Sequence, residues 1–340
     1  MIITSAHMGS DGISREIIVQ TAAYIIGLAG VLMILSLNYN IFVGLEKLLY
    51  IASILMLLTV YIPGLGVEIY GARSWIDLGV TTLQPSEFVK ITFILLMANY
   101  LNEHQDTLHD FKGLIKAGIF AAPIIVIVLK EDLGSALVFS AIWLTMIFFA
   151  GIDLKVFAKF IGLVVCAIPV AYVFMADYQK ERIEAFLHPE NLNLSGNYQV
   201  WQSKVAIGSG GLTGSGLFNG TQKELDFIPV QTSDFVFSVI GEELGLIGGL
   251  CVIGLFGLLL YRMAVTVRDA LDFYGALVVS GVIGMFAFQM FENIAMTMGL
   301  MPVTGITLPF ISYGGSSILS NMAAFGLVLN VNMRSKSINF

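Results

Sequence analysis

Apolar residues fill long stretches of this 340-residue chain, and short polar segments separate the stretches. Nine stretches approach the roughly 20 residues that a helix needs to cross a bilayer. They lie at 17–38, 43–62, 86–101, 114–130, 135–151, 155–176, 234–261, 273–299 and 316–333. The pattern predicts an all-α polytopic membrane protein with about nine transmembrane helices.

The composition agrees with this prediction and argues against some classes of function. The chain is 57% hydrophobic and 12% charged, whereas soluble domains carry about 25% charged residues. Its net charge of −7 argues against nucleic acid as a partner. Cys166 and Cys251 both fall inside apolar runs and are expected to be free thiols. The sequence has no GxxxxGK[ST] phosphate loop, so an ATP-driven pump is not expected.

Lysine and arginine residues gather in alternate connections between the apolar stretches, and the positive-inside rule places those connections in the cytoplasm. They are Lys47, Lys112, Lys116, Lys155, Lys159, Arg262, Arg268, Arg334 and Lys336. The loops at 63–85, 177–233 and 300–315 then face outward. The sequence therefore predicts a single integral membrane domain over 1–340, in which 177–233 is a large extracellular loop with an amphipathic helix near 198–208.

Carboxylates at the start of the seventh apolar stretch need an explanation, because charge is costly in lipid. Asp234 stands at the mouth of the predicted helix, where it can cap the helix. Partly desolvated at the rim of a cavity, it can also act as a general base that takes a hydroxyl proton. Glu242 and Glu243 lie about two turns deeper. These two carboxylates either pair with cations of another span or have a role in catalysis or transport.

The segment 71–90 places polar side chains around the outer end of the third predicted span. Trp75 suits an interfacial aromatic belt, and Glu87 with Lys90 suits an ion pair at i, i+3 spacing. A lysine inside a span is rare without a purpose, so a functional cavity that includes Arg73 is the equal alternative.

Three other segments carry candidate chemistry. Asp132 lies in a short charged turn, which is usually just solvated. The glycine-rich run 206–220, beside Lys204, is typical of a flexible connection but can also cradle phosphates through backbone N–H groups. The most distinctive string is NIAMTMGLMPVTGITLPFISYGGSS at 293–317, where Gly, Pro and Ser interrupt the apolar pattern. Irregular backbone at membrane depth needs protein cover or a wet cavity.

This string resembles a signature of the SEDS family (shape, elongation, division and sporulation proteins), which includes RodA, FtsW and SpoVE. The signature residues are Asn293, Gly299, Pro302, Gly305 and the run Ser312-Tyr313-Gly314-Gly315-Ser316-Ser317. The segments GARSWIDLG…LQPSEFVK, RIEAFLHPE…YQVWQSKVAIGSGGLTGSG and PVQTSDFVFSVIGEELGLIG resemble further family blocks, in family order. The resemblance covers nearly the whole chain and is most like the RodA branch.

The resemblance implies a peptidoglycan glycosyltransferase that polymerises lipid II (an undecaprenyl-diphosphate-linked disaccharide peptide) at the outer face of the bacterial cytoplasmic membrane, for cell elongation. It implies a class B penicillin-binding protein as partner, and it makes Asp234 the catalytic residue. It also assigns activity or cavity roles to Arg73, Trp75, Glu87, Lys90, Asp132, Lys204, Glu243 and Ser312.

Two features depart from the family pattern. Family members usually have ten spans, whereas Ile2–Ala6 resembles only the last turn of a first span, so the N-terminus is expected outside. The family's Gln-Pro-Asp-Leu-Gly turn reads Lys130-Glu131-Asp132-Leu133-Gly134, which adds opposite charges beside Asp132.

Elementary chemistry indicates how such an enzyme would work. Asp234 accepts the proton of an acceptor hydroxyl, which displaces the donor's lipid diphosphate and inverts the anomeric carbon, so one general base suffices. Arg73, Lys90 and Lys204 are candidates to stabilise the departing diphosphate, and Mg²⁺ or another divalent cation is a further candidate. Two alternatives stay open from the sequence: a flippase for a lipid-linked precursor that uses the intramembrane charges, and a non-catalytic activator of a transpeptidase.

Overall fold

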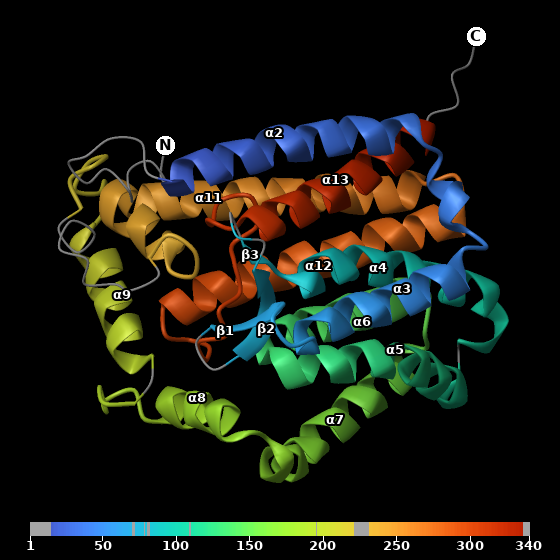
Figure 1. Cartoon of the computed structure of the whole chain (residues 1–340), viewed down its shortest axis with the longest axis horizontal. Coiled ribbons are helices and arrows are strands. Elements are labelled where there is room, and N and C mark those ends of the chain that lie inside the picture. Colours follow the sequence, from blue (N-terminus) through green and yellow to red (C-terminus); the bar gives the residue numbers. More distant parts are fainter. Residues whose placement is uncertain are drawn as a thin grey trace. The chain divides into compact units, whose positions relative to one another are not determined.

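The computed structural model describes residues 15–69, 72–77, 79, 82–108, 110–194, 196–220 and 231–335 (Figure 1). The helices are α2 Arg15–Ser36, α3 Glu46–Leu58, α4 Pro85–Glu103, α5 Phe111–Glu131, α6 Leu133–Phe149, α7 Leu154–Phe174, α8 Asp177–Leu187, α9 Asn197–Ser209, α11 Val236–Asp269, α12 Phe273–Thr297 and α13 Gly315–Ser335. Short 3₁₀ helices are η1 Tyr39–Phe42, η2 Thr59–Tyr61 and η3 Gln105–Thr107. The strands are β1 Gly66–Ile69, β2 Ala72–Asp77 and β3 Thr82–Leu83.

Every predicted apolar stretch forms a helix, which confirms the helical architecture. The boundaries agree least at α11, which continues to Asp269 rather than ending near residue 261. By length and composition, α2, α5, α11 and α12 are each sufficient to cross a membrane. Their outward faces carry large apolar side chains, such as Leu32 of α2, which is 61% exposed, and Ile247 of α11, which is 63% exposed. Such faces suit a lipid environment.

The described chain divides into two compact units. The first contains the chain up to Ile25, with Ala176–Leu259 and Ala287–Ile318. The second contains Ile26–Met175, Leu260–Phe286 and the chain from Leu319. Residues of α2, α11, α12 and α13 belong to both units. The single domain over 1–340 and the outward position of 177–233 stay predictions.

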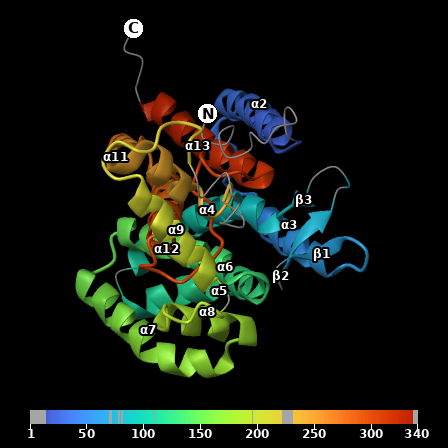
Figure 2. The same cartoon turned by 90° about the vertical axis from the view of Figure 1, so that its left-hand side faces the viewer.

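A small antiparallel sheet in the second unit was not predicted from the sequence. Its strands are ordered β1-β2-β3, with Val67 opposite Trp75 and Ile76 opposite Leu83 (Figure 2). The alternation of polar and apolar residues in ARSWID is the strand period that could have revealed it. The Asp77 carboxylate accepts a hydrogen bond from Gly79 N at 2.7 Å and so forms the turn that follows β2.

Helices α3, α4, α5 and α6 of the second unit pack side by side (Figure 1). Phe93 of α4 and Phe139 of α6 are both fully buried, and their rings meet edge to face at 5.1 Å. The predicted spans in this unit therefore pack together as one helical bundle.

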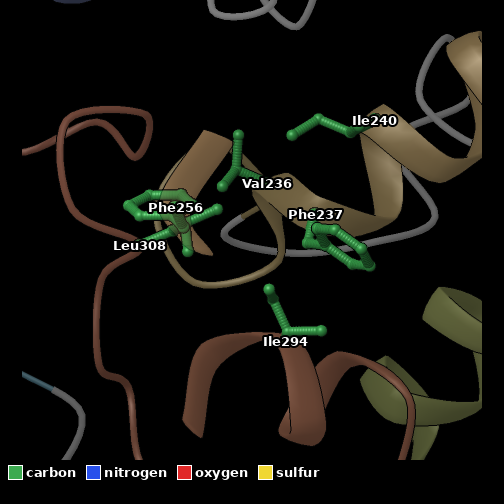
Figure 3. Close-up of a cluster of buried hydrophobic side chains, with 6 residues drawn as sticks. All are labelled: Val236, Phe237, Ile240, Phe256, Ile294 and Leu308. Atoms are coloured by element: carbon green, nitrogen blue, oxygen red, sulfur yellow. The ribbon is translucent and has the colours of Figure 1, made fainter. Parts of the chain in front are cut away.

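In the first unit, an apolar cluster joins three chain segments (Figure 3). Val236, Phe237 and Ile240 of α11 pack with Ile294 of α12 and with Leu308 from the irregular segment that follows α12. Large buried side chains each contribute about 1.5–3 kcal/mol of hydrophobic stabilisation. The cluster anchors the start of α11, and Asp234 lies just before that start.

Helix α11 is interrupted at Gly245, whose φ of 65° and ψ of −163° are not helical. In an unbroken helix, the amides of Leu246 and Ile247 would donate to the carbonyls of Glu242 and Glu243. They donate instead to the carbonyls of residues 211 and 212, at 2.9 and 3.2 Å. The carbonyls of Glu242 and Glu243 in turn accept from the amides of residues 215 and 216, at 3.0 and 3.1 Å. We call residues 211–216 the inserted glycine loop, because they replace two bonds of the helix.

Glycine is required for this insertion. A Cβ on Gly214 would lie 2.1 Å from the Glu243 carbonyl oxygen, and a Cβ on Gly245 would lie 2.4 Å from Gly214 N. Both contacts are with backbone and cannot relax by a side-chain rotation. The glycine-rich run is therefore a packed element of the fold, and the flexible connection expected as its simplest interpretation is wrong.

Candidate active site

Asp234 is positioned through the backbone of its own segment. Three consecutive carbonyls accept hydrogen bonds: Thr232 O from Tyr313 N at 2.9 Å, Ser233 O from the Ser312 hydroxyl, and Asp234 O from Asn293 Nδ2 at 2.8 Å. We call this arrangement the carbonyl clamp. The donors come from α12 and from the segment after it. The clamp therefore fixes the backbone position of Asp234, whose side chain is half-buried.

Asn293 and Ser312 each serve the clamp and the irregular segment together. Asn293, fully buried in α12, also donates to Ile306 O at 2.8 Å. The Ser312 hydroxyl accepts from Leu308 N at 2.8 Å while donating to Ser233 O. Both side chains satisfy backbone groups that irregular backbone would otherwise leave unpaired in a buried place. The structure thus places Ser312 beside Asp234, with a positioning role.

Gly305 lies next to the Asp234 carboxylate. A Cβ on Gly305 would lie 3.5 Å from Asp234 Oδ2, and the φ of Gly305 is +74°. Glycine tolerates this left-handed conformation without strain. The backbone of residue 305 can therefore turn beside the Asp234 carboxylate.

A second carboxylate supports the same segment. Glu292 is fully buried in α12, and its Oε1 accepts a hydrogen bond from the Thr304 hydroxyl at 3.0 Å. The sequence analysis did not select Glu292. The signal was available, because an ionisable residue within a span usually faces a partner or a cavity.

The first unit also contains a hollow between α8, α9 and the segment after α12. Its lining includes Arg182, Phe186, Val200, Lys204, Gly299 and Val303, and we call it the α8–α9 hollow. The predicted helix near 198–208 is confirmed as α9, and Lys204 is exposed on it. The Ser203 hydroxyl donates to Thr297 O at 2.8 Å and so fixes α9 to the end of α12.

Glu242 and Glu243 are each only 1% exposed and lie at the break in α11. Their carbonyls hold the inserted glycine loop, and a Cβ on Gly220 would lie 2.8 Å from Glu242 Oε2. The predicted site residue Glu243 therefore belongs to the interrupted part of the helix, where its backbone has a structural role.

The other predicted site residues belong to the second unit. Lys90 and Glu87 form an ion pair at 2.8 Å within α4, and the lysine is 1% exposed. The Ser320 hydroxyl donates to Glu87 O at 2.6 Å. The ion-pair interpretation is confirmed, and a functional role for this pair stays a prediction.

Arg73 and Trp75 lie on β2, two residues apart and therefore on the same face of the strand. Arg73 is exposed, and its Nε would lie 3.1 Å from a Cβ on Gly66 in β1. Arg73 is thus an exposed cation on a strand that pairs with β1 on one side and β3 on the other.

Asp132 caps helix α6. Its carboxylate accepts from Gly134 N at 3.0 Å, from Ser135 N at 3.0 Å and from the Ser135 hydroxyl at 2.6 Å. These are the bonds of a helix N-cap. The geometry supports a structural role for Asp132, and its cavity role stays a prediction.

Within the residues that the structure describes, no group of three or more His, Cys, Asp or Glu side chains is close enough to hold a metal ion. Cys166 and Cys251 are free thiols, as predicted. The expected last turn of a first span at 2–6, and Lys336, lie outside the described residues.

Comparison with known proteins gives long matches. The family model described as "Cell cycle protein", for FtsW, RodA and SpoVE, matches residues 1–337. The chain is 39% identical over 313 residues to stage V sporulation protein E of Bacillus subtilis, covering 92% of this chain and 85% of that protein. It is 34% identical over 342 residues to the peptidoglycan glycosyltransferase MrdB of Escherichia coli K12, covering 100% and 90%.

Solved structures share the fold. A chain of a peptidoglycan synthase complex, described for its coordination of polymerization and crosslinking, matches with a TM-score of 0.82 and 30% identity, over 99% of this chain and 94% of that chain. The rod shape determining protein RodA of Thermus thermophilus matches with a TM-score of 0.71 and 29% identity, over 99% and 92%.

Proposed function

Because the chain belongs to the SEDS family of FtsW, RodA and SpoVE, we propose that it polymerises lipid II at the outer face of the bacterial cytoplasmic membrane. The chain is a multi-pass membrane protein and a peptidoglycan glycosyltransferase. A role in cell elongation is part of the proposal.

The observation that carries the mechanism is the placement of Asp234. The carbonyl clamp holds its backbone, and Gly305 lies beside its carboxylate. A carboxylate held in this way can take the proton of an acceptor sugar hydroxyl. The hydroxyl oxygen then bonds to the donor's anomeric carbon, the bond from that carbon to the lipid diphosphate breaks, and the carbon is inverted. Lipid diphosphate leaves with the bonding electron pair.

The departing diphosphate needs positive charge as its own negative charge develops. Lys204 is an exposed cation in the same unit as Asp234 and is suited to this role. A role for Arg73, which is exposed in the second unit, stays a prediction, and Lys90 is buried against Glu87. The described side chains form no preorganised metal site. The proposed steps use the protein's own cations. A role for Mg²⁺ is a separate proposal, which metal removal by EDTA followed by Mg²⁺ addition would test.

We propose a class B penicillin-binding protein as partner. The support is the similarity to a chain of a peptidoglycan synthase complex that is described as coupling polymerization with crosslinking. Glycan synthesis measured with and without a co-purified transpeptidase tests this part of the proposal.

The test of Asp234 uses purified full-length protein and lipid II in detergent, where glycan strands are measured by gel electrophoresis. Asp234→Asn should lower the rate by about 10²–10⁴-fold, because general-base assistance is lost. Asp177→Asn is the matched control, because Asp177 is an exposed carboxylate at the start of α8. Unchanged strand synthesis by Asp234→Asn would remove Asp234 from the mechanism.

The detergent assay also separates an enzyme from a flippase. Detergent removes the two sides of the membrane, so polymerisation can occur but transport cannot. A protein that only moves lipid II would yield no strands with any variant, and a non-catalytic activator would be insensitive to Asp234→Asn.

A further inference from the structure

The α8–α9 hollow presents two cations to one small space. Arg182 comes from α8 and Lys204 from α9, and both line the hollow. Neither cation forms an ion pair with a carboxylate in the described part of the chain. Among the described residues that line the hollow, none has an acidic side chain. Two like charges that share a recess are a favourable place for an anion.

The geometry holds each cation in place. Arg182 donates to Thr304 O at 3.2 Å, and its guanidinium lies 5.9 Å from the centre of the Tyr178 ring. A Cβ on Gly299 would lie 3.5 Å from Lys204 Nζ, so the ammonium lies close to the glycine in the turn that follows α12. Because one Arg182 nitrogen is already committed, its remaining donors are those available to a ligand.

The hollow and Asp234 are connected through two consecutive residues of the segment after α12. Arg182 contacts the carbonyl of Thr304, and the next residue, Gly305, lies against the Asp234 carboxylate. A molecule bound in the hollow is therefore close to the proposed general base. Phe186, Val200 and Val303 give the hollow apolar walls, which favour a ligand with both an anionic group and an apolar body.

We propose that the α8–α9 hollow is an oxyanion-binding subsite in which Arg182 and Lys204 hold a phosphate or carboxylate group of the substrate. This inference rests on the proposed function, because lipid II supplies both kinds of oxyanion: its diphosphate and the carboxylates of its peptide. Arg182 and Lys204 provide charge-assisted hydrogen bonds. The subsite holds the substrate while Asp234 reacts with it.

A purely structural role for Lys204 is the competing explanation. A lysine at a helix C-terminus is stabilised by the helix dipole. Helix α12 ends at Thr297, and Leu300 N closes the turn after it by donating to Ala295 O at 2.8 Å. That role predicts a change in thermal stability with no preference among ligands. The subsite predicts a change in binding that depends on which anion the ligand carries.

The test measures binding without turnover. The full-length Asp234→Asn protein in detergent is titrated with lipid II, with undecaprenyl diphosphate, and with the disaccharide peptide that lacks the lipid diphosphate. Adding Lys204→Gln should weaken lipid II binding about tenfold or more, the effect of losing a charge-assisted hydrogen bond. Arg182→Gln should act in the same direction, and Lys204→Arg should retain binding. Lys159→Gln, an exposed lysine of α7, is the matched control and should change nothing.

The three ligands identify the anion. If the group is the diphosphate, Lys204→Gln weakens undecaprenyl diphosphate but not the disaccharide peptide; if it is a peptide carboxylate, the reverse holds. If each of the three ligands binds to the Lys204→Gln protein as tightly as to its parent, the subsite proposal is overturned. Failure of the unsubstituted protein to polymerise lipid II contradicts the proposed function instead, so the two failures are distinguishable.

Discussion

At the scale of single residues, Asp234 owes its position to neighbours that carry no charge. Asn293 and Ser312 hold two of the three carbonyls in the clamp, and a backbone amide holds the third. Reactivity of a carboxylate depends strongly on placement, since a misplacement of about 1 Å can cost about 10²-fold in rate. Uncharged residues around Asp234 should therefore matter nearly as much as the carboxylate.

Ser312→Ala tests this expectation. The variant loses the hydrogen bond to Ser233 O and the one from Leu308 N, so kcat should fall about ten- to a hundredfold through misplacement of Asp234. If Ser312 only positions Asp234, KM and the pH profile of kcat should change little, because the serine hydroxyl does not titrate and a positioning residue does not bind substrate. Ser280→Ala is the matched control: its buried hydroxyl bonds only to Leu277 O in its own helix, and its kcat should stay normal. A large rise in KM with unchanged kcat would contradict the positioning role.

The sequence predicted the identity of these residues better than their roles. Asp234 could be selected because a carboxylate interrupts an apolar run, whereas Ser312 was selected through the resemblance to a family signature. The structure places the two residues close together, since the Ser312 hydroxyl donates to Ser233 O. The roles of Asp132 and Asn293 could not be derived, because a cap and a clamp depend on which backbone groups lack partners. Those groups are known only when the path of the backbone is known.

At the scale of elements, the inserted glycine loop makes α11 a discontinuous helix. The loop replaces two hydrogen bonds of the helix without leaving Leu246 or Ile247 unpaired. Interrupted helices in membrane proteins are tolerated where other protein segments satisfy the freed groups. The inserted glycine loop therefore ties the 177–233 region by backbone hydrogen bonds to α11, the helix that begins just after Asp234.

Gly245→Ala should release this insertion. The new methyl would clash with Gly214 N, and a φ of 65° with a ψ of −163° is strained for alanine. Hydrogen exchange should then lose protection at the amides of Leu246 and Ile247. Gly254→Ala in the same helix has open space and should be neutral or stabilising, because alanine favours helix by about 1 kcal/mol. Retained protection in Gly245→Ala would show that the insertion is not held by these glycines.

Element-level prediction succeeded where the signal is local and failed where it is not. Apolar runs gave the helices, since a span must satisfy its own backbone. The sheet of β1 to β3 and the break in α11 depend on pairing between segments, and periodicity along one segment does not report that pairing. Gly214 and Gly245 were visible in the sequence, but their contact was not.

At the scale of the whole molecule, the distribution of charge sets the orientation in the membrane. The predicted topology places α8 outside the cell and the start of α5 inside. In a background that lacks Cys166 and Cys251, Asp177→Cys should therefore react with a membrane-impermeant maleimide on intact cells. Lys112→Cys should react only after the membrane is opened. Both parent side chains are exposed, so burial does not explain a difference. The opposite labelling pattern would invert the topology and remove Asp234 from the outer face.

The carbonyl clamp has a practical consequence. Three neighbouring carbonyls depend on donors from a separate stretch of the chain, and each bond can be contested by another hydrogen-bond donor. A small inhibitor that wedges between these two stretches would displace Asp234 without resembling a sugar or a lipid.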